Sequence, residues 1–151
     1  MTKEKIGMFP GSFDPLHAGH LDIIKRASKL FDKLYVVVSI NIYKKPTQEK
    51  NEILLNVKKA IEQLALNNVQ TFINNGLTID FAKKHNCHWI VRSVRSKKDV
   101  QYEMIMAQSN HFLDNNIETV LMVADEKLKN ISSSGLKLIK ANIQKIKRED
   151  K

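Results

Sequence analysis

The sequence predicts an α/β fold in which helices cover both faces of a five-stranded parallel sheet. Five short apolar runs, rich in β-branched residues, alternate with segments whose apolar residues recur at helical spacing. One run, LYVVVSI at 34–40, is almost continuously apolar, which is typical of a strand buried on both faces. Short connections between such alternating segments produce right-handed crossovers and parallel strands. We therefore expect residues 1–151 to form a single doubly wound domain.

The first half of the chain supplies two predicted strands and two predicted helices. A short apolar strand at 6–9 precedes a helix at 19–30, and the strand at 34–40 precedes a helix at 48–66. Each helix has one apolar face, formed in the first by Leu21, Ile24, Ala27, Leu30 and Phe31. The second helix presents Ile53, Leu54, Val57, Ala60, Ile61 and Leu64.

The second half repeats the alternation. Strands are predicted at 69–73, 88–92 and 118–124, and helices at 78–85 and 98–113. A last helix spans SSSGLKLIKANIQKIK, with Ser132 or Ser133 as its N-cap. We assign one apolar group on the helix at 98–113 to the core, namely Met104, Ile105 and Met106.

Composition and charge exclude several classes of protein. No apolar run approaches the roughly 18 residues that a membrane span needs, and the first residues lack the apolar stretch of a signal peptide, so we expect a cytoplasmic protein. Cys87 is the single cysteine, which excludes an internal disulfide, and we expect it to be a small buried residue. The net charge of +9 comes almost entirely from dispersed lysines, without a nucleic-acid-binding motif, so nucleic acid is an improbable partner.

Unusual residues follow every predicted strand. Ligands of such Rossmann-like sheets bind at the carboxyl ends of the strands, near the point where the strand order reverses. The segments that follow the five strands in order are PGSFDPLHAGH, NIYKKP, NNGLT, RSVRSKK and ADEKLKNISSS. This edge of the sheet is therefore the predicted site.

The stretch GMFPGSFDPLHAGH at 7–20 carries the strongest chemical signal. Pro10 and Gly11 turn the chain as it leaves the first strand, and Ser12 offers a hydroxyl and a backbone N–H. The helix that follows has free N–H groups and a dipole that favour an anion. His17 and His20 are three residues apart at its entrance, where neutral imidazoles suit hydrogen bonding to phosphate.

GSFDPLHAGH resembles the [ST]-F-D-x-x-H-x-G-H signature of the nucleotidyltransferases. RSVRSKKDVQYE at 92–103 is similar to the R-G-x-R-x-x-x-D-x-x-Y-E segment of the phosphopantetheine adenylyltransferase family. YKKP at 43–46 and NISSS at 130–134 stand in the same order as in that family, so the resemblance covers nearly the whole chain. It implies transfer of AMP from ATP to 4′-phosphopantetheine, giving dephospho-coenzyme A and pyrophosphate, with Mg²⁺ accompanying ATP and a homo-oligomer, a hexamer in the family.

The resemblance also implies roles for individual residues. It makes His20, Lys44, Arg92 and Ser12 catalytic, and it places phosphopantetheine against Ser12, Lys44, Leu77, Thr78 and Arg92. Glu103 would contact the ribose side of the nucleotide, and Asp14 is a structural residue of the turn. The full implied ATP site consists of Ser12, Phe13, His17, His20, Ser93, Val94, Arg95, Glu103, Leu128, Ile131, Ser132, Ser133 and Ser134. No protein side chain is expected to ligate the metal.

Two alternatives stay open from the sequence. The first is another nucleotidyltransferase with the same histidine motif, such as a cytidylyltransferase. The second is a basic nucleic-acid-binding module that keeps the fold and has lost turnover, which would show steeply salt-dependent RNA affinity.

Overall fold

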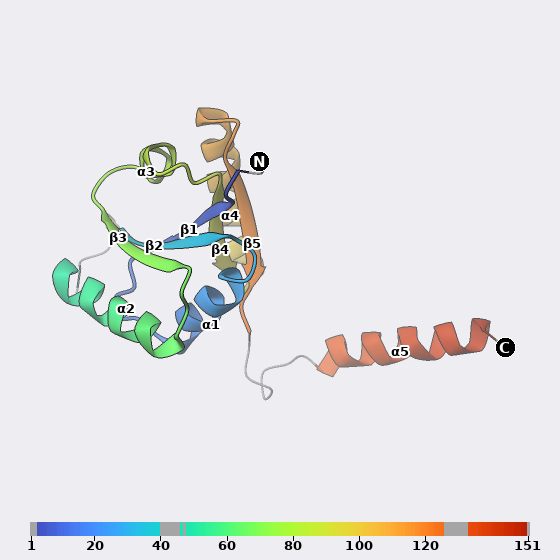
Figure 1. The fold of residues 1–151 in the computed structure, drawn as a ribbon. Helices are drawn as coiled ribbons and strands as arrows, with labels where there is room; N and C mark the ends of the chain where they lie inside the picture. Colours follow the sequence, from blue (N-terminus) through green and yellow to red (C-terminus); the bar gives the residue numbers. More distant parts are fainter. Residues whose placement is uncertain (1–2, 40–45, 47, 126–132, 151) are drawn as a thin grey trace.

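The computed structural model describes residues 3–39, 46, 48–125 and 133–150, and within them it has five strands that alternate with five helices (Figure 1). The strands are β1 (Ile6–Gly11), β2 (Lys33–Ser39), β3 (Val69–Asn74), β4 (Trp89–Val94) and β5 (Glu118–Val123). The helices are α1 (Ala18–Ala27), α2 (Lys50–Leu64), α3 (Thr78–Lys84), α4 (Lys97–Leu113) and α5 (Ser133–Glu149).

All strand pairings are parallel, in the order β3-β2-β1-β4-β5. The chain builds outward from β1 to β3 and then returns to the other side of β1 with β4. The strand order therefore reverses between β1 and β4, the position that favours ligand binding in open α/β sheets. The predicted α/β class with a five-stranded parallel sheet is confirmed.

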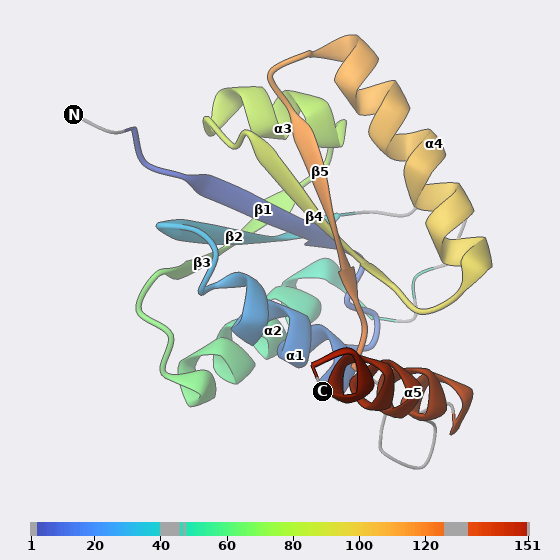
Figure 2. The same ribbon diagram turned by 90° about the vertical axis from the view of Figure 1, so that its right-hand side faces the viewer.

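Helices lie on both faces of the sheet. Figures 1 and 2 show α1 and α2 on one face and α3 and α4 on the other. Alternate residues of β2 divide between the two cores: Leu34, Val36 and Val38 pack with residues of α1 and α2, whereas Tyr35 and Val37 pack with residues of α3. This alternation is why the β2 segment reads as one continuous apolar run.

The first helix, predicted at 19–30, is shorter in the structure, and the prediction that Leu30 lies on its buried face is wrong. Helix α1 ends at Ala27, where the Ser28 hydroxyl donates a hydrogen bond to the Lys25 carbonyl at 2.7 Å. Leu30 then lies in the turn that leads into β2 and is 53% exposed. The apolar face predicted for α2 is confirmed, because Ile53, Val57 and Ile61 are buried.

The assignment of Met104, Ile105 and Met106 to the core is also wrong, because these side chains are 50%, 62% and 40% exposed. Helix α4 lies beside β4 and β5, at one end of the sheet, and only Glu103 among its residues is fully buried. The apolar residues on its other sides lack a sheet to cover them.

Cys87 is fully buried, as predicted, and this burial raises the pKa of its thiol to about 12. The thiol therefore stays protonated at neutral pH and is a poor nucleophile.

Helix α5 extends away from the sheet and its covering helices (Figure 1). The apolar side chains of Leu138, Ile139, Ile143 and Ile146 on it are exposed. Of the two residues predicted as the N-cap, Ser132 lies outside the described residues, and Ser133 is not the cap because it is the first residue of α5. In the part of the chain that the structure describes, no helix is long and apolar enough to cross a membrane.

Candidate active site

The predicted site residues that the structure describes gather mainly where β1 and β4 end. Strand β1 ends at Gly11, so Ser12 follows it directly, and His17 and His20 stand at the start of α1. Arg92 lies within β4 and Arg95 follows its last residue. Because β1 and β4 are neighbours in the sheet, the two loops leave it side by side at the position where the strand order reverses.

The loop after β1 is shaped by Phe13, which has a φ of 49° and is 1% exposed. A non-glycine residue in this left-handed region is uncommon and is held there by its surroundings. The Phe13 ring packs edge-on against Phe9 and His20, with centroids 5.5 and 4.9 Å apart. A Cβ atom at Gly11 would lie 3.1 Å from this ring, so glycine leaves the space that Phe13 needs. Phe13 in turn supports the ring of His20.

His17 and His20 form a reciprocal cap at the start of α1. The Nδ1 atom of His17 accepts a hydrogen bond from the Gly19 N–H at 3.1 Å, and the His17 N–H donates to Nδ1 of His20 at 3.2 Å. The two rings stack with centroids 3.7 Å apart. An Nδ1 atom that accepts leaves the proton of a neutral imidazole on Nε2, so both rings are set as Nε2–H donors. A Cβ at Gly19 would lie 3.0 Å from the His17 ring, which explains the glycine between the histidines.

The pKa of His20 is lowered from 6.5 to about 4. Burial is the largest cause, because it disfavours the charged ring, and the nearby charges of His17 and Arg95 lower the pKa further. His20 therefore acts as a neutral hydrogen-bond donor at physiological pH.

We expect His20 in the free protein to stay neutral down to roughly pH 5 and to titrate near its pKa of about 4. Inorganic pyrophosphate bound nearby will raise this pKa, because an anion favours the protonated ring. The measurement is a pH titration of the His20 Cε1–H resonance by NMR, assigned with the His20→Ala variant. A free-protein titration near 6.5 would show that burial does not control this ring.

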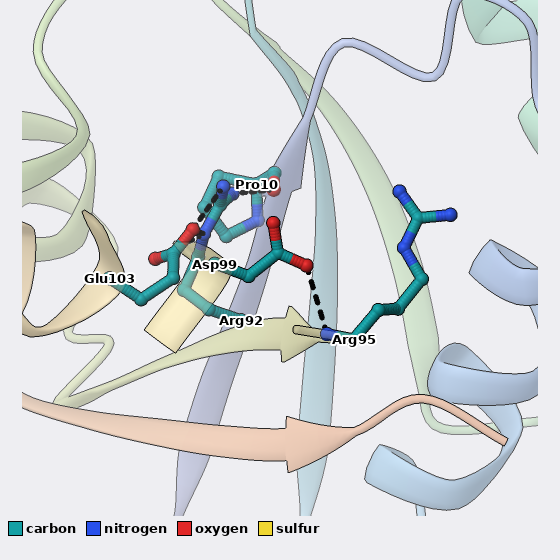
Figure 3. A network of polar contacts seen from close by, with 5 residues as sticks. All are labelled: Pro10, Arg92, Arg95, Asp99 and Glu103. Atoms are coloured by element: carbon teal, nitrogen blue, oxygen red, sulfur yellow. Dashed lines mark hydrogen bonds and ion pairs between the residues drawn. The ribbon is translucent and has the colours of Figure 1, made fainter. Parts of the chain in front are cut away.

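The guanidinium of Arg92 is held by two residues, Glu103 and Pro10 (Figure 3). Its Nε–H donates to both carboxylate oxygens of Glu103 at 3.0 Å, and Nη2 donates to Oε1 of the same residue at 2.9 Å. Its Nη1 donates to the Pro10 carbonyl oxygen at 2.7 Å, which ties β4 to the end of β1. The Glu103 residue is 5% exposed, whereas the Arg92 side chain is 32% exposed and reaches solvent.

Arg95 is positioned through its backbone. Its N–H donates to Oδ2 of Asp99 at 2.9 Å, and the Asp99 N–H donates to the hydroxyl of Ser96, the N-cap of α4, at 3.2 Å. Figure 3 shows the Arg95 side chain extending away from Asp99. Its guanidinium is exposed and lies close enough to contribute to the lowered pKa of His20.

Sequence reasoning missed two groups that hold these arginines. Asp99 belongs to the RSVRSKKDVQYE segment, but we assigned it no role; its place three residues after the N-cap Ser96 is the signal that would have found it. The Pro10 carbonyl carries no signal in the sequence. The family resemblance also places Ser93 and Val94, at the end of β4, in the ATP site. Ser93 is half-buried and Val94 is buried.

Two residues that the resemblance places against phosphopantetheine, Leu77 and Thr78, lie farther along the same edge of the sheet, after β3. Thr78 begins α3 and is half-buried, and Leu77 before it is 64% exposed. The Asn74 side chain shapes this turn, because it accepts from the Gly76 N–H at 3.1 Å and donates to the Leu77 carbonyl at 3.3 Å. A pocket of about 350 Å³ adjoins this end of β3, lined by Glu49, Lys50, Asn51, Ile73 and Asn75.

Several predicted residues are not tested by the geometry. Lys44, Leu128, Ile131 and Ser132 lie outside the described residues, and Ser133 and Ser134 begin α5 with side chains that are not described. Within the described ranges, no three His, Cys, Asp or Glu side chains are grouped so that they could hold a metal ion.

Comparison with known proteins first shows the class of protein to which the chain belongs. Residues 8–139 match the family model described as Cytidylyltransferase-like, so the chain belongs to this class of nucleotidyltransferases. Among curated relatives, the phosphopantetheine adenylyltransferase of Limosilactobacillus fermentum is 44% identical over 133 residues, which cover 88% of this chain and 76% of the relative. The Clostridium botulinum protein of the same name is 42% identical over 135 residues, which cover 89% and 84%. The chain is a member of the phosphopantetheine adenylyltransferase family.

Solved structures show the same fold at low sequence identity. A lipopolysaccharide core biosynthesis protein from Thermoplasma volcanium has a TM-score of 0.59 and 23% identity, with 83% of this chain and 99% of that chain covered. A pantothenate synthetase from Thermus thermophilus has a TM-score of 0.58 and 14% identity, with 82% and 57% covered. These likenesses concern the fold alone.

Proposed function

We propose that the protein transfers AMP from ATP to 4′-phosphopantetheine, releasing pyrophosphate and forming dephospho-coenzyme A. The observation that carries the proposal is the 44% identity to a relative named phosphopantetheine adenylyltransferase over most of both chains. The geometry supports it, because a neutral imidazole donor and two arginines stand at the ends of neighbouring strands.

The chemistry needs no general base from the protein. An oxygen of the acceptor phosphate, already ionised at neutral pH, attacks the α-phosphorus of ATP. A new P–O bond forms, the bond to the bridging oxygen breaks, and its electron pair leaves with pyrophosphate. Catalysis is then positioning and stabilisation of charge on the α-phosphate oxygens.

The residues of the site divide this work. His20 donates from Nε2 to the α-phosphate, and Ser12 lies between the two substrates. Arg92 and Lys44 bind the acceptor phosphate, and Arg95 binds the phosphates of ATP. The ATP site in this proposal is completed by the backbone of Phe13, the imidazole of His17 and the three serines Ser132, Ser133 and Ser134.

Mg²⁺ accompanies ATP and neutralises charge on its phosphates. In this proposal the ion is carried by phosphate oxygens and water rather than by protein side chains. The reaction belongs in the cytoplasm in this proposal, with ATP and phosphopantetheine as the partners rather than nucleic acid.

The test is a coupled assay of pyrophosphate release by the purified protein with Mg²⁺. ATP with 4′-phosphopantetheine is the expected substrate pair, and CTP with an alcohol phosphate is the arm that represents a cytidylyltransferase. Turnover with the second pair and none with the first would overturn the proposal. RNA affinity that falls steeply with salt, without turnover of either pair, would favour the nucleic-acid-binding module.

The protein assembles as a homo-oligomer in this proposal. Helix α4 leaves Met104, Ile105, Phe112 and Leu113 exposed, with Phe112 at 90%. Exposed apolar surface that adjoins polar residues is characteristic of protein interfaces, and association of identical chains is the most common way to cover it.

We expect Phe112→Glu to shift the protein toward smaller species, because it introduces a charge at the most exposed apolar side chain of α4. The measurement is sedimentation velocity over a range of concentrations. Leu55→Glu is the matched control, since Leu55 is an exposed leucine on α2, 51% exposed. A wild-type protein that sediments as a monomer at all concentrations would contradict the oligomer.

A further inference from the structure

Arg26 is the one arginine on α1, and it connects this helix to a strand from the second half of the chain. Its Nη1 atom donates to Oδ2 of Asp22 at 3.0 Å and to the Val123 carbonyl oxygen at 3.0 Å. Asp22 and Arg26 are four residues apart on α1, the spacing at which an acidic and a basic side chain meet on a helix. The carboxylate therefore holds the guanidinium in the position from which it reaches Val123.

Val123 is the last residue of β5, an edge strand that pairs with β4 alone in the described sheet. Figures 1 and 2 show the end of β5 beside α1. A strand at the edge of a sheet has ladder hydrogen bonds on one side only, so its end has less support than the end of an inner strand. The charged donor of Arg26 makes a hydrogen bond about twice as strong as one between neutral groups. This contact therefore fixes the end of β5 against α1.

The end of β5 in turn supports the end of β4. The Ala124 N–H donates to the Val94 carbonyl oxygen at 2.9 Å, one residue beyond the last register pair of the two strands. Arg95 follows Val94 directly, and both belong to the ATP site of the proposed function. A continuous series of contacts thus runs from α1, whose first turn carries His20, through β5 to Arg95.

The acceptor residues that follow β3 lie on the other side of the sheet. Leu77 and Thr78 come after β3, and β2, β1 and β4 stand between β3 and β5 in the strand order. A shift at the end of β5 should therefore disturb the groups that face ATP and leave these acceptor residues in place.

We infer that Arg26 is a positioning residue that, held by Asp22, fixes the end of β5 and thereby the position of Arg95 relative to the histidines of α1. The consequence for catalysis rests on the proposed function, and it is selective for ATP. Arg26 acts through the backbone of β5 and β4, so its removal misplaces the groups that bind the nucleotide phosphates without removing any of them.

The kinetic test compares the wild type with Arg26→Met, which keeps a long unbranched side chain and removes the donors. We expect the KM for ATP to rise about threefold to tenfold, with the KM for 4′-phosphopantetheine within about twofold of the wild type. Lys25→Met is the matched control, because Lys25 is exposed on the same helix and the change removes the same charge. An unchanged KM for ATP in Arg26→Met, an equal rise in both KM values, or an equal effect of Lys25→Met would overturn the inference.

Asp22→Leu separates the positioning role from a direct contact of Arg26 with ATP. Loss of the Asp22 carboxylate releases the guanidinium, so the KM for ATP should rise in the wild-type background and should not rise further in Arg26→Met. If the guanidinium bound the phosphates directly, removal of the neighbouring negative charge would lower this KM. A KM for ATP that falls or stays unchanged in Asp22→Leu would therefore overturn the inference.

An NMR readout is independent of turnover. The Ala124 N–H is protected by its bond to the Val94 carbonyl, so it should exchange with solvent faster in Arg26→Met than in the wild type and in Lys25→Met. If the wild type releases no pyrophosphate from ATP and 4′-phosphopantetheine, the proposed function fails, but faster exchange confined to Arg26→Met still supports the positioning role. Equal exchange rates of Ala124 in the wild type and Arg26→Met overturn that role whatever the activity.

Discussion

His20→Ala is expected to lower kcat by about 10²- to 10³-fold, with a modest change in the KM for ATP. The neutral ring is fixed by its Nδ1 contact with the His17 N–H and by the edge-on contact with Phe13, so its Nε2–H is oriented before substrate binds. Such a donor stabilises charge that grows on the α-phosphate in the transition state. Its loss therefore reduces the rate more than it reduces ground-state affinity.

The matched control for His20→Ala is His88→Ala. His88 is exposed and directly precedes β4, so it lies at the opposite edge of the sheet from the site. Steady-state kinetics of pyrophosphate release with both substrates varied should show a large kcat effect at His20 alone. A His20→Ala protein with unchanged kcat and an equal loss in substrate binding would assign the ring to binding and remove it from the chemistry.

The position of the site could be predicted from the sequence because parallel strands impose it. Every strand of such a sheet ends at the same edge, so the loops after β1 and β4 must lie together once the strands alternate with helices. Ser12, His20 and Arg92 therefore belong to β4 and to the segments that follow β1, at the same edge of the sheet. The core of β2 was equally predictable, since its continuous apolar run fits only a strand covered on both faces.

The tertiary partners of the arginines could not be predicted in the same way. The pairing of Glu103 with Arg92 joins residues on two different elements, and the contact of Arg92 with Pro10 joins positions 82 residues apart. Glutamate on a helix normally faces solvent, so periodicity gives no reason to bury this one. Its burial follows from the guanidinium opposite, which becomes visible only when β4 and α4 are placed together.

Helix α4 also shows why the exposed methionines were misassigned. Apolar side chains such as Met104, Ile105 and Phe112 occur around much of its circumference, so no single apolar face identifies the buried side. The side that meets the sheet is fixed instead by Asp99 and Glu103, the two polar residues that bind the arginines. The polar contacts therefore set the rotation of α4, and its apolar residues point outward, where we place an interface between identical chains.

The second large effect is expected for the stability of Arg92→Leu. Removing one member of a buried ion pair leaves the other charge without its partner, which costs roughly 3 to 5 kcal/mol when both groups are buried. The Glu103 side chain is 6% exposed and that of Arg92 is 32% exposed, so we expect a loss near the lower end, about 3 kcal/mol in the free energy of unfolding. Urea denaturation followed by circular dichroism measures this loss.

The double variant Arg92→Leu/Glu103→Leu separates stability from function. Two apolar side chains of similar volume remove the unpaired carboxylate, so the free energy of unfolding should return to within about 1 kcal/mol of the wild type. Pyrophosphate release should not recover, because the double variant has no guanidinium for the acceptor phosphate. If the Arg92→Leu protein were as stable as the wild type, Glu103 would have found another partner or reached water. The ion pair would then not be what holds α4 against β4. Full recovery of activity in the double variant would instead remove Arg92 from the acceptor site.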